Sequence, residues 1–101
     1  MPLTSKQRAQ LRGLAAAEDT IIYIGKGDIS DNIIRQTADA LKARELIKGK
    51  VLDNSMLSPR GAAEMLAEAT KSEVVQAIGS KFVLYKRNEK EPKIELVKAK
   101  K

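Results

Sequence analysis

The stretch from residue 21 to residue 34 constrains the fold of this chain more than any other. Residues 21–24 form a short β-branched and aromatic run, which is typical of a strand buried on both faces. A four-residue loop follows, made of Gly25, Lys26, Gly27 and Asp28. Ser30 then has the side chain that commonly caps a helix N-terminus. The order of strand, glycine loop and helix start is one way in which proteins aim backbone N–H groups at a phosphate.

Three segments have the spacing of amphipathic helices. The first follows a capping-box pattern at Thr4 and Gln7, the second runs from Ser30 to about residue 44, and the third starts with Ser58 and Pro59. The pattern predicts buried faces made of Gln7, Leu11, Leu14 and Ala15, then Ile33, Ile34, Thr37, Ala38 and Leu41, then Ala62, Met65, Leu66 and Ala69. Gly13, inside the first helix, predicts the close approach of another backbone.

Three further strands are predicted. Residues 46–52 alternate, with Lys48 and Lys50 on one side, either as guards of an edge strand or as part of a basic face. Residues 73–78 and 82–86 flank the short connection 79–81, which is typical of a hairpin. The element order α-β-α-β-α-β-β therefore predicts an α/β fold with a four-stranded mixed sheet packed by helices.

The charge distribution favours a polyanionic partner. The net charge of the 101-residue chain is +6, and residues 86–101 carry seven Lys or Arg against three Glu. We therefore expect one domain over residues 1–87 and a basic tail over residues 88–101. Much of the tail is expected to be mobile, and the alternative is that its apolar patch of Ile94, Leu96 and Val97 docks on the body. The sequence has no apolar run of bilayer length and no signal-peptide pattern at its start, so a cytoplasmic protein without membrane contact is expected.

The absence of Cys and His removes most catalytic and metal chemistry. Thiolate nucleophiles, imidazole bases and the common zinc sites are excluded. The remaining carboxylate pairs, Asp28 with Asp31 and Glu64 with Glu68, have spacings that helix caps and solvated helix faces commonly produce. We expect no enzyme, no cofactor, no metal site and no small-molecule substrate.

Several segments, taken together and in this order, resemble the YhbY family of small bacterial proteins. They are Leu-Thr-Ser-Lys-Gln-Arg at 3–8, Leu-Arg-Gly-Leu-Ala at 11–15, Ile-Gly-Lys-Gly at 24–27, Ala-Leu-Lys-Ala-Arg-Glu-Leu-Ile-Lys at 40–48, Val-Gln-Ala-Ile-Gly at 75–79 and Phe-Val-Leu-Tyr at 82–85. The resemblance implies a single CRM domain with a fold similar to the C-terminal domain of translation initiation factor 3. It also implies a non-catalytic RNA-binding protein that associates with ribosomal RNA of the precursor large ribosomal subunit and acts in ribosome assembly.

The GxxG loop of that family falls on residues 25–28, where the last glycine is replaced by Asp28. A carboxylate here opposes a phosphate, or alternatively caps the turn before the second helix. We expect the RNA-binding residues to be Lys6, Arg8, Arg12, Gly25, Lys26, Gly27, Asp28, Ser30, Arg35, Lys48 and Lys50. The alternatives are a purely structural glycine turn, and a solvated helix face for Arg8 and Arg12.

Aromatic residues are scarce, with one Phe and two Tyr, and no RNP-like pattern is present. This argues against base stacking on a sheet as the main mode of RNA binding. Tyr23 and Tyr85 are predicted to be core or half-buried residues. We expect the protein to be a monomer. The sequence leaves a second function open, a protein-interaction module that reaches the ribosome through a protein partner.

Overall fold

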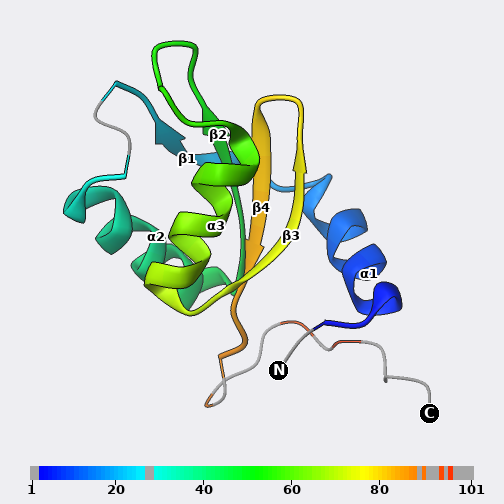
Figure 1. The fold of residues 1–101 in the computed structure, drawn as a ribbon. Helices are drawn as coiled ribbons and strands as arrows, with labels where there is room; N and C mark the ends of the chain where they lie inside the picture. The colour runs from blue at the N-terminus through cyan, green and yellow to red at the C-terminus, as the bar shows by residue number, and fades with distance from the viewer. Residues whose placement is uncertain (1–2, 27–28, 89, 91–93, 95, 97–101) are drawn as a thin grey trace.

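The computed structural model describes residues 3–26, 29–88, 90, 94 and 96. The elements are α1 (Ser5–Ala15), β1 (Thr20–Ile24), α2 (Asp31–Arg44), β2 (Leu46–Val51), α3 (Pro59–Thr70), β3 (Glu73–Ile78) and β4 (Lys81–Tyr85) (Figure 1). The predicted order α-β-α-β-α-β-β is confirmed. No helix among these residues has the length and apolar character needed to cross a membrane.

The four strands form one mixed sheet in the order β1-β2-β4-β3. β1 and β2 are parallel, as the strand–helix–strand connection predicts, and the other two pairings are antiparallel. The β3–β4 turn consists of Gly79, whose φ of 62° favours glycine, and Ser80. β2 lies between β1 and β4, so the interpretation of Lys48 and Lys50 as guards of an edge strand is wrong.

Helices cover the two faces of the sheet unequally. α2 and α3 lie together on one face, and α1 lies apart from them against β2, β3 and β4 on the other, here called the α1 face (Figure 1). The larger cluster, on the α2 and α3 side, includes Ile22, Ile24, Ile47, Leu66, Phe82 and Leu84. The α1 face has a smaller cluster of Leu11, Ala15, Leu46, Val75, Val83 and Tyr85. Part of the α1 face is therefore left open.

The helix starts confirm the predicted caps. Thr4 and Gln7 form both hydrogen bonds of a capping box, at 3.0 and 3.1 Å. The Ser58 hydroxyl accepts from the Gly61 N–H at 3.0 Å, with Pro59 at the first helical position. These bonds join residues three apart, so the local sequence is sufficient to specify them.

Several predicted buried positions are exposed. Leu14 is 44% exposed, Met65 is 48% exposed, and Ala38 and Ala69 also face outward. α3 packs instead through the residues Ala62, Ala63, Leu66, Ala67 and Thr70. Small side chains let this helix lie close to the sheet, which turns its contact face by about one residue from the predicted stripe.

β1 is buried on one face only, which corrects the prediction of burial on both. Ile22 and Ile24 are in the larger cluster, whereas Tyr23 is 51% exposed. β1 is an edge strand, and α1 packs on the other three strands. The prediction that Tyr23 is a core or half-buried residue is therefore wrong, while Tyr85, 3% exposed, is in the core as predicted.

The prediction about Gly13 is also wrong. A Cβ built at this position meets nothing within 4 Å among the described residues, and Gly13 is exposed on α1. No close backbone approach explains this glycine.

Glu45, directly after α2, is completely buried and connects the body to residues near the C-terminus. Its carboxylate accepts from the Asn88 N–H at 2.6 Å and from the Ile94 N–H at 2.7 Å. Ile94 and Leu96 pack against the smaller cluster. Burial, and then the nearby Glu45 carboxylate, raise the pKa of Tyr85.

Candidate nucleic-acid interface

The open part of the α1 face carries alternate residues of β2 and β4. Lys48 pairs with Val83 and Lys50 pairs with Lys81 across the two strands. Because residues paired across strands point to the same face, these three lysines lie on the α1 face. The predicted grouping of Lys48 with Lys50 is therefore retained, and Lys81 joins them.

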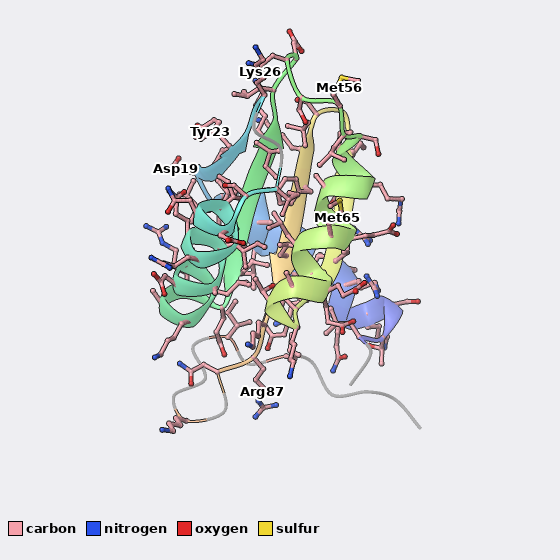
Figure 2. The ribbon with its side chains drawn as sticks, turned by 60° about the vertical axis from the view of Figure 1, so that its left-hand side comes forward. Asp19, Tyr23, Lys26, Met56, Met65 and Arg87 are labelled. Carbon is pink, nitrogen blue, oxygen red and sulfur yellow. The ribbon has the colours of Figure 1, made fainter. Side chains whose placement is uncertain are left out.

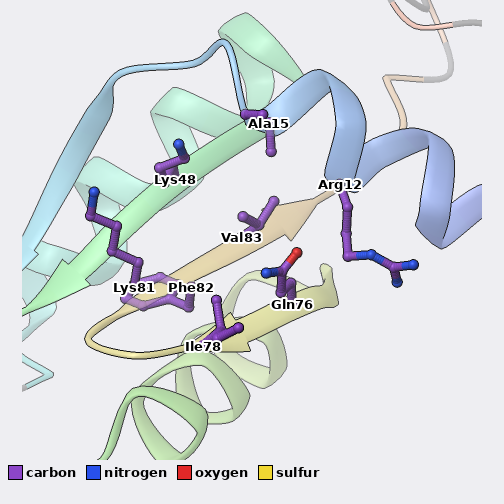
Figure 3. Close-up of a pocket in the computed structure, with 9 residues that line it drawn as sticks. Arg12, Ala15, Lys48, Gln76, Ile78, Lys81, Phe82 and Val83 are labelled. Atoms are coloured by element: carbon purple, nitrogen blue, oxygen red, sulfur yellow. The ribbon is translucent and has the colours of Figure 1, made fainter.

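A shallow pocket lies between α1 and this part of the sheet. Its lining includes Arg12, Ala15, Lys48, Gln76, Ile78 and Lys81, and its volume is about 170 Å³ (Figure 3). This is below the range of about 300–1,000 Å³ of typical small-molecule sites. The pocket is better described as a hollow in a larger surface.

Arg12, Lys48, Lys50 and Lys81 form what we call the basic strip. Among the described residues, the ion pairs join Arg44 to Glu18 at 3.9 Å and Arg60 to Glu64 at 3.6 Å. No carboxylate in this part of the chain neutralises a cation of the basic strip. Such a group of uncompensated cations attracts a polyanion.

The loop after β1 lies at the same end of the sheet as Lys50 and Lys81. Ile24 pairs with Val51, and Lys26 follows two residues later as an exposed side chain (Figure 2). A Cβ on Gly25 would lie 3.3 Å from Oδ1 of Asn54, so this glycine lets the loop pass close to the β2–α3 connection. Its φ is outside the left-handed region. Gly27 and Asp28 lie outside the described residues.

The start of α2 contributes less directly to the candidate interface. The Ser30 hydroxyl accepts from the Ile33 N–H at 3.2 Å, so it is engaged as the helix cap. Arg35 is exposed on α2, which packs on the opposite face of the sheet from the basic strip. The structure therefore does not bring Arg35 together with Lys48 and Lys50.

The two arginines of α1 have different surroundings although they lie one turn apart. Arg8 is partly buried, and its guanidinium donates to the backbone carbonyl of Val74 in β3. Arg12 is exposed and lies at the rim of the hollow (Figure 3). Arg8 therefore helps to hold α1 on the sheet, whereas Arg12 remains accessible. Lys6 is exposed about 9 Å from Arg12 along the helix axis.

Sequence reasoning missed Lys81 and Tyr23. Lys81 was placed in the hairpin turn, but β4 starts at this residue, so it shares a face with Val83 and Tyr85. That alternation was the available signal for Lys81. No local signal identifies Tyr23, because its exposure depends on where α1 packs.

Carboxylate clusters are not a feature of this surface. Among the described residues, no three His, Cys, Asp or Glu side chains gather as metal ligands would. The described part of the chain therefore offers no carboxylate or imidazole cluster for a metal ion.

Comparison with known proteins relates the chain to a domain family and to named RNA-binding proteins. The CRS1 / YhbY (CRM) domain matches residues 3–86. "Probable RNA-binding protein YqeI" of Bacillus subtilis is 45% identical over 94 residues, covering 93% of this chain and 98% of that protein. "RNA-binding protein" of Haemophilus influenzae is 32% identical, covering 93% of this chain and 94% of that protein.

A solved structure has the same fold. The solution structure of SAV1595 from Staphylococcus aureus superposes with a TM-score of 0.79 at 48% sequence identity. The match covers 95% of this chain and 100% of that one. The mixed four-stranded sheet with three helices is thus shared by a relative of nearly the same length.

Proposed function

The chain belongs to the CRS1 / YhbY (CRM) domain family, and from this premise we propose that it is a non-catalytic RNA-binding protein. Its RNA is ribosomal RNA of the precursor large ribosomal subunit, and its role is in ribosome assembly. It acts in the cytoplasm as a monomer, through contacts to the phosphate backbone. The names of the relatives from Bacillus subtilis and Haemophilus influenzae support RNA over other polyanions.

The observation that carries the proposal is the basic strip beside the Lys26 loop. Four cations from α1, β2 and β4 lie on one face without carboxylate partners among the described residues. α3, on the other face, exposes Glu64 and Glu68. Residues 1–85 carry 12 basic and 10 acidic groups, a net charge of only +2, so the grouping of uncompensated cations on the α1 face is what lets it bind a polyanion.

Replacing Lys26 with glutamate is expected to weaken binding to large-subunit ribosomal RNA by about tenfold at low salt, because a phosphate contact becomes a repulsion. The slope of the logarithm of affinity against the logarithm of salt concentration should fall by about 1. Filter binding of transcribed RNA over a salt series measures both quantities.

Arg60→Glu is the matched control for that experiment. It makes the same change in net charge on α3, which packs on the opposite face of the sheet from the basic strip, and there Arg60 pairs with Glu64. Binding should change little. If Lys26→Glu binds as tightly as the parent chain at low salt, the loop has no role in RNA binding.

The rival function is a protein-interaction module that reaches the ribosome through a protein. Exposed apolar side chains near α3 favour it, since Met56 is 90% and Met65 48% exposed. In this reading the basic tail supplies only non-specific attraction to RNA.

Replacing Lys90, Lys93, Lys98, Lys100 and Lys101 with glutamine separates the two functions. This variant removes every cation of residues 88–101 and keeps the residues that contact Glu45 and the smaller cluster. We expect the neutralised chain to retain most of its affinity for ribosomal RNA, measured by the same filter assay. Complete loss of RNA affinity, with an unchanged circular dichroism spectrum, would favour the rival.

A further inference from the structure

We propose that the RNA on the α1 face is single-stranded where it crosses the sheet, and that one of its bases stacks on the ring of Tyr23. This inference rests on the proposed function and specifies which form of RNA the site takes. The general phosphate contacts remain with Lys26 and the basic strip.

Four side chains form a row across all four strands on this face. Tyr23 in β1 pairs with Lys50 in β2, Lys50 pairs with Lys81 in β4, and Lys81 pairs with Ile78 in β3. Neighbouring strands are about 4.8 Å apart, so the row is about 14 Å wide. It presents an aromatic ring at one edge and two ammonium groups in the middle.

The ring of Tyr23 is accessible. Its side chain projects from β1 away from α3, and the residue is 51% exposed (Figure 2). Its hydroxyl donates to the backbone carbonyl of Thr20 at 3.3 Å, a long hydrogen bond between exposed groups that leaves the ring face open to a base.

The charges around the ring suit a phosphate backbone. Lys50 is its neighbour in β2, Lys26 follows three residues later, and neither has a carboxylate partner among the described residues. Flexible lysines that follow a backbone, next to an aromatic ring that receives a base, are the usual parts of single-strand sites. Inside a duplex both faces of each base are covered by neighbouring bases, so only an unpaired base can use the ring.

Binding to two RNA probes tests the inference. Poly(U) represents single-stranded RNA, and a long, fully paired RNA duplex without overhangs leaves base faces uncovered only at its two ends. Tyr23→Ala should weaken poly(U) binding by about fivefold to a hundredfold, the range for loss of one stacked base. Its affinity for the duplex should stay unchanged, whereas Lys26→Glu should weaken binding of both probes.

Tyr23→Trp provides a direct spectroscopic test. The chain has no Trp, so this variant carries a single indole reporter. It should bind poly(U) at least as tightly as the parent, and poly(U) should quench its fluorescence while the duplex should not. The exposed position makes both variants compatible with folding, which circular dichroism verifies.

Equal effects of Tyr23→Ala on the two probes, or no effect on poly(U), would overturn the stacking inference. So would a tryptophan signal that poly(U) leaves unchanged. If the parent chain binds RNA and Lys26→Glu weakens that binding, the proposed function stands even where the stacking inference fails. A parent chain that binds neither probe overturns the proposed function itself.

Discussion

Gly49→Ala is expected to lower the free energy of unfolding by about 3 kcal/mol, the upper part of the range for overpacking a core. Gly49 pairs with Phe82 across the two central strands. A Cβ at residue 49 would lie 2.2 Å from Cζ of Phe82, and the ring is only 1% exposed. Because the ring is enclosed by the larger cluster, it cannot move aside without displacing other core side chains.

Gly13→Ala is the matched control for that prediction. The same atoms are added at a helical position with nothing within 4 Å among the described residues. Here alanine should stabilise the protein by about 0.5–1 kcal/mol through helix propensity. Urea denaturation, analysed with one m-value for both variants, measures their free energies of unfolding. The changes relative to the parent chain should have opposite signs.

A second substitution identifies the cause of the Gly49 effect. Phe82→Leu removes ring atoms that the new methyl group would meet, so the double variant should lose less stability than the two single losses together. A Gly49→Ala protein as stable as the parent would show that the core accommodates the methyl group.

Glu45→Gln is expected to lower the free energy of unfolding by about 2 kcal/mol, because a hydrogen bond to a buried carboxylate is lost and an amide N–H is left unsatisfied. The carboxylate accepts from both Asn88 and Ile94. Glutamine has one accepting oxygen, so its NH₂ group must face one of these two N–H donors.

Hydrogen exchange of the Asn88 and Ile94 amides measures this effect directly. Exchange should accelerate at both sites in Glu45→Gln, because the segment that carries Ile94 then packs less firmly on the body. Glu68→Gln, exposed on α3, makes the same charge change and should leave both rates unaltered.

The backbone conformation at residue 45 allows the role of the carboxylate to be separated from the effect of backbone strain. Its φ is 65°, a conformation that glycine adopts at little cost and glutamate does not. If the carboxylate is the important group, Glu45→Gly should also accelerate exchange despite the relaxed backbone. Unchanged protection in both variants would contradict the anchoring role of Glu45.

Local patterns were enough to predict the elements and their order. Thr4, Ser30 and Ser58 each accept a hydrogen bond from an N–H three residues later, so the information for each helix start lies within one turn. The wrong predictions concern burial, as at Leu14 and Tyr23, or the neighbours of an element, as at Gly13. Periodicity identifies the residues that share a face, but it does not identify the element that covers that face.

The candidate site likewise combines features that local patterns predict with features that only the packing of the elements decides. Alternation along β2 correctly grouped Lys48 with Lys50, since neighbouring residues of a strand point to opposite faces. Sheet order brought in Lys81 from β4 and placed the lysines on a central strand. Packing of α1 gave Arg8 a backbone partner on β3 and left Arg12 exposed at the hollow.

The sequence by itself determined the order of helices and strands, the helix caps, the family and the cationic character of the chain, because these depend on residue types and short spacings. Only the tertiary structure decided which cations share a surface. It also decided that Tyr23 is exposed beside Lys50, and that Glu45 accepts hydrogen bonds from Asn88 and Ile94. The physical reason is that accessibility and pairing depend on contacts between residues far apart in the chain, which no local pattern encodes.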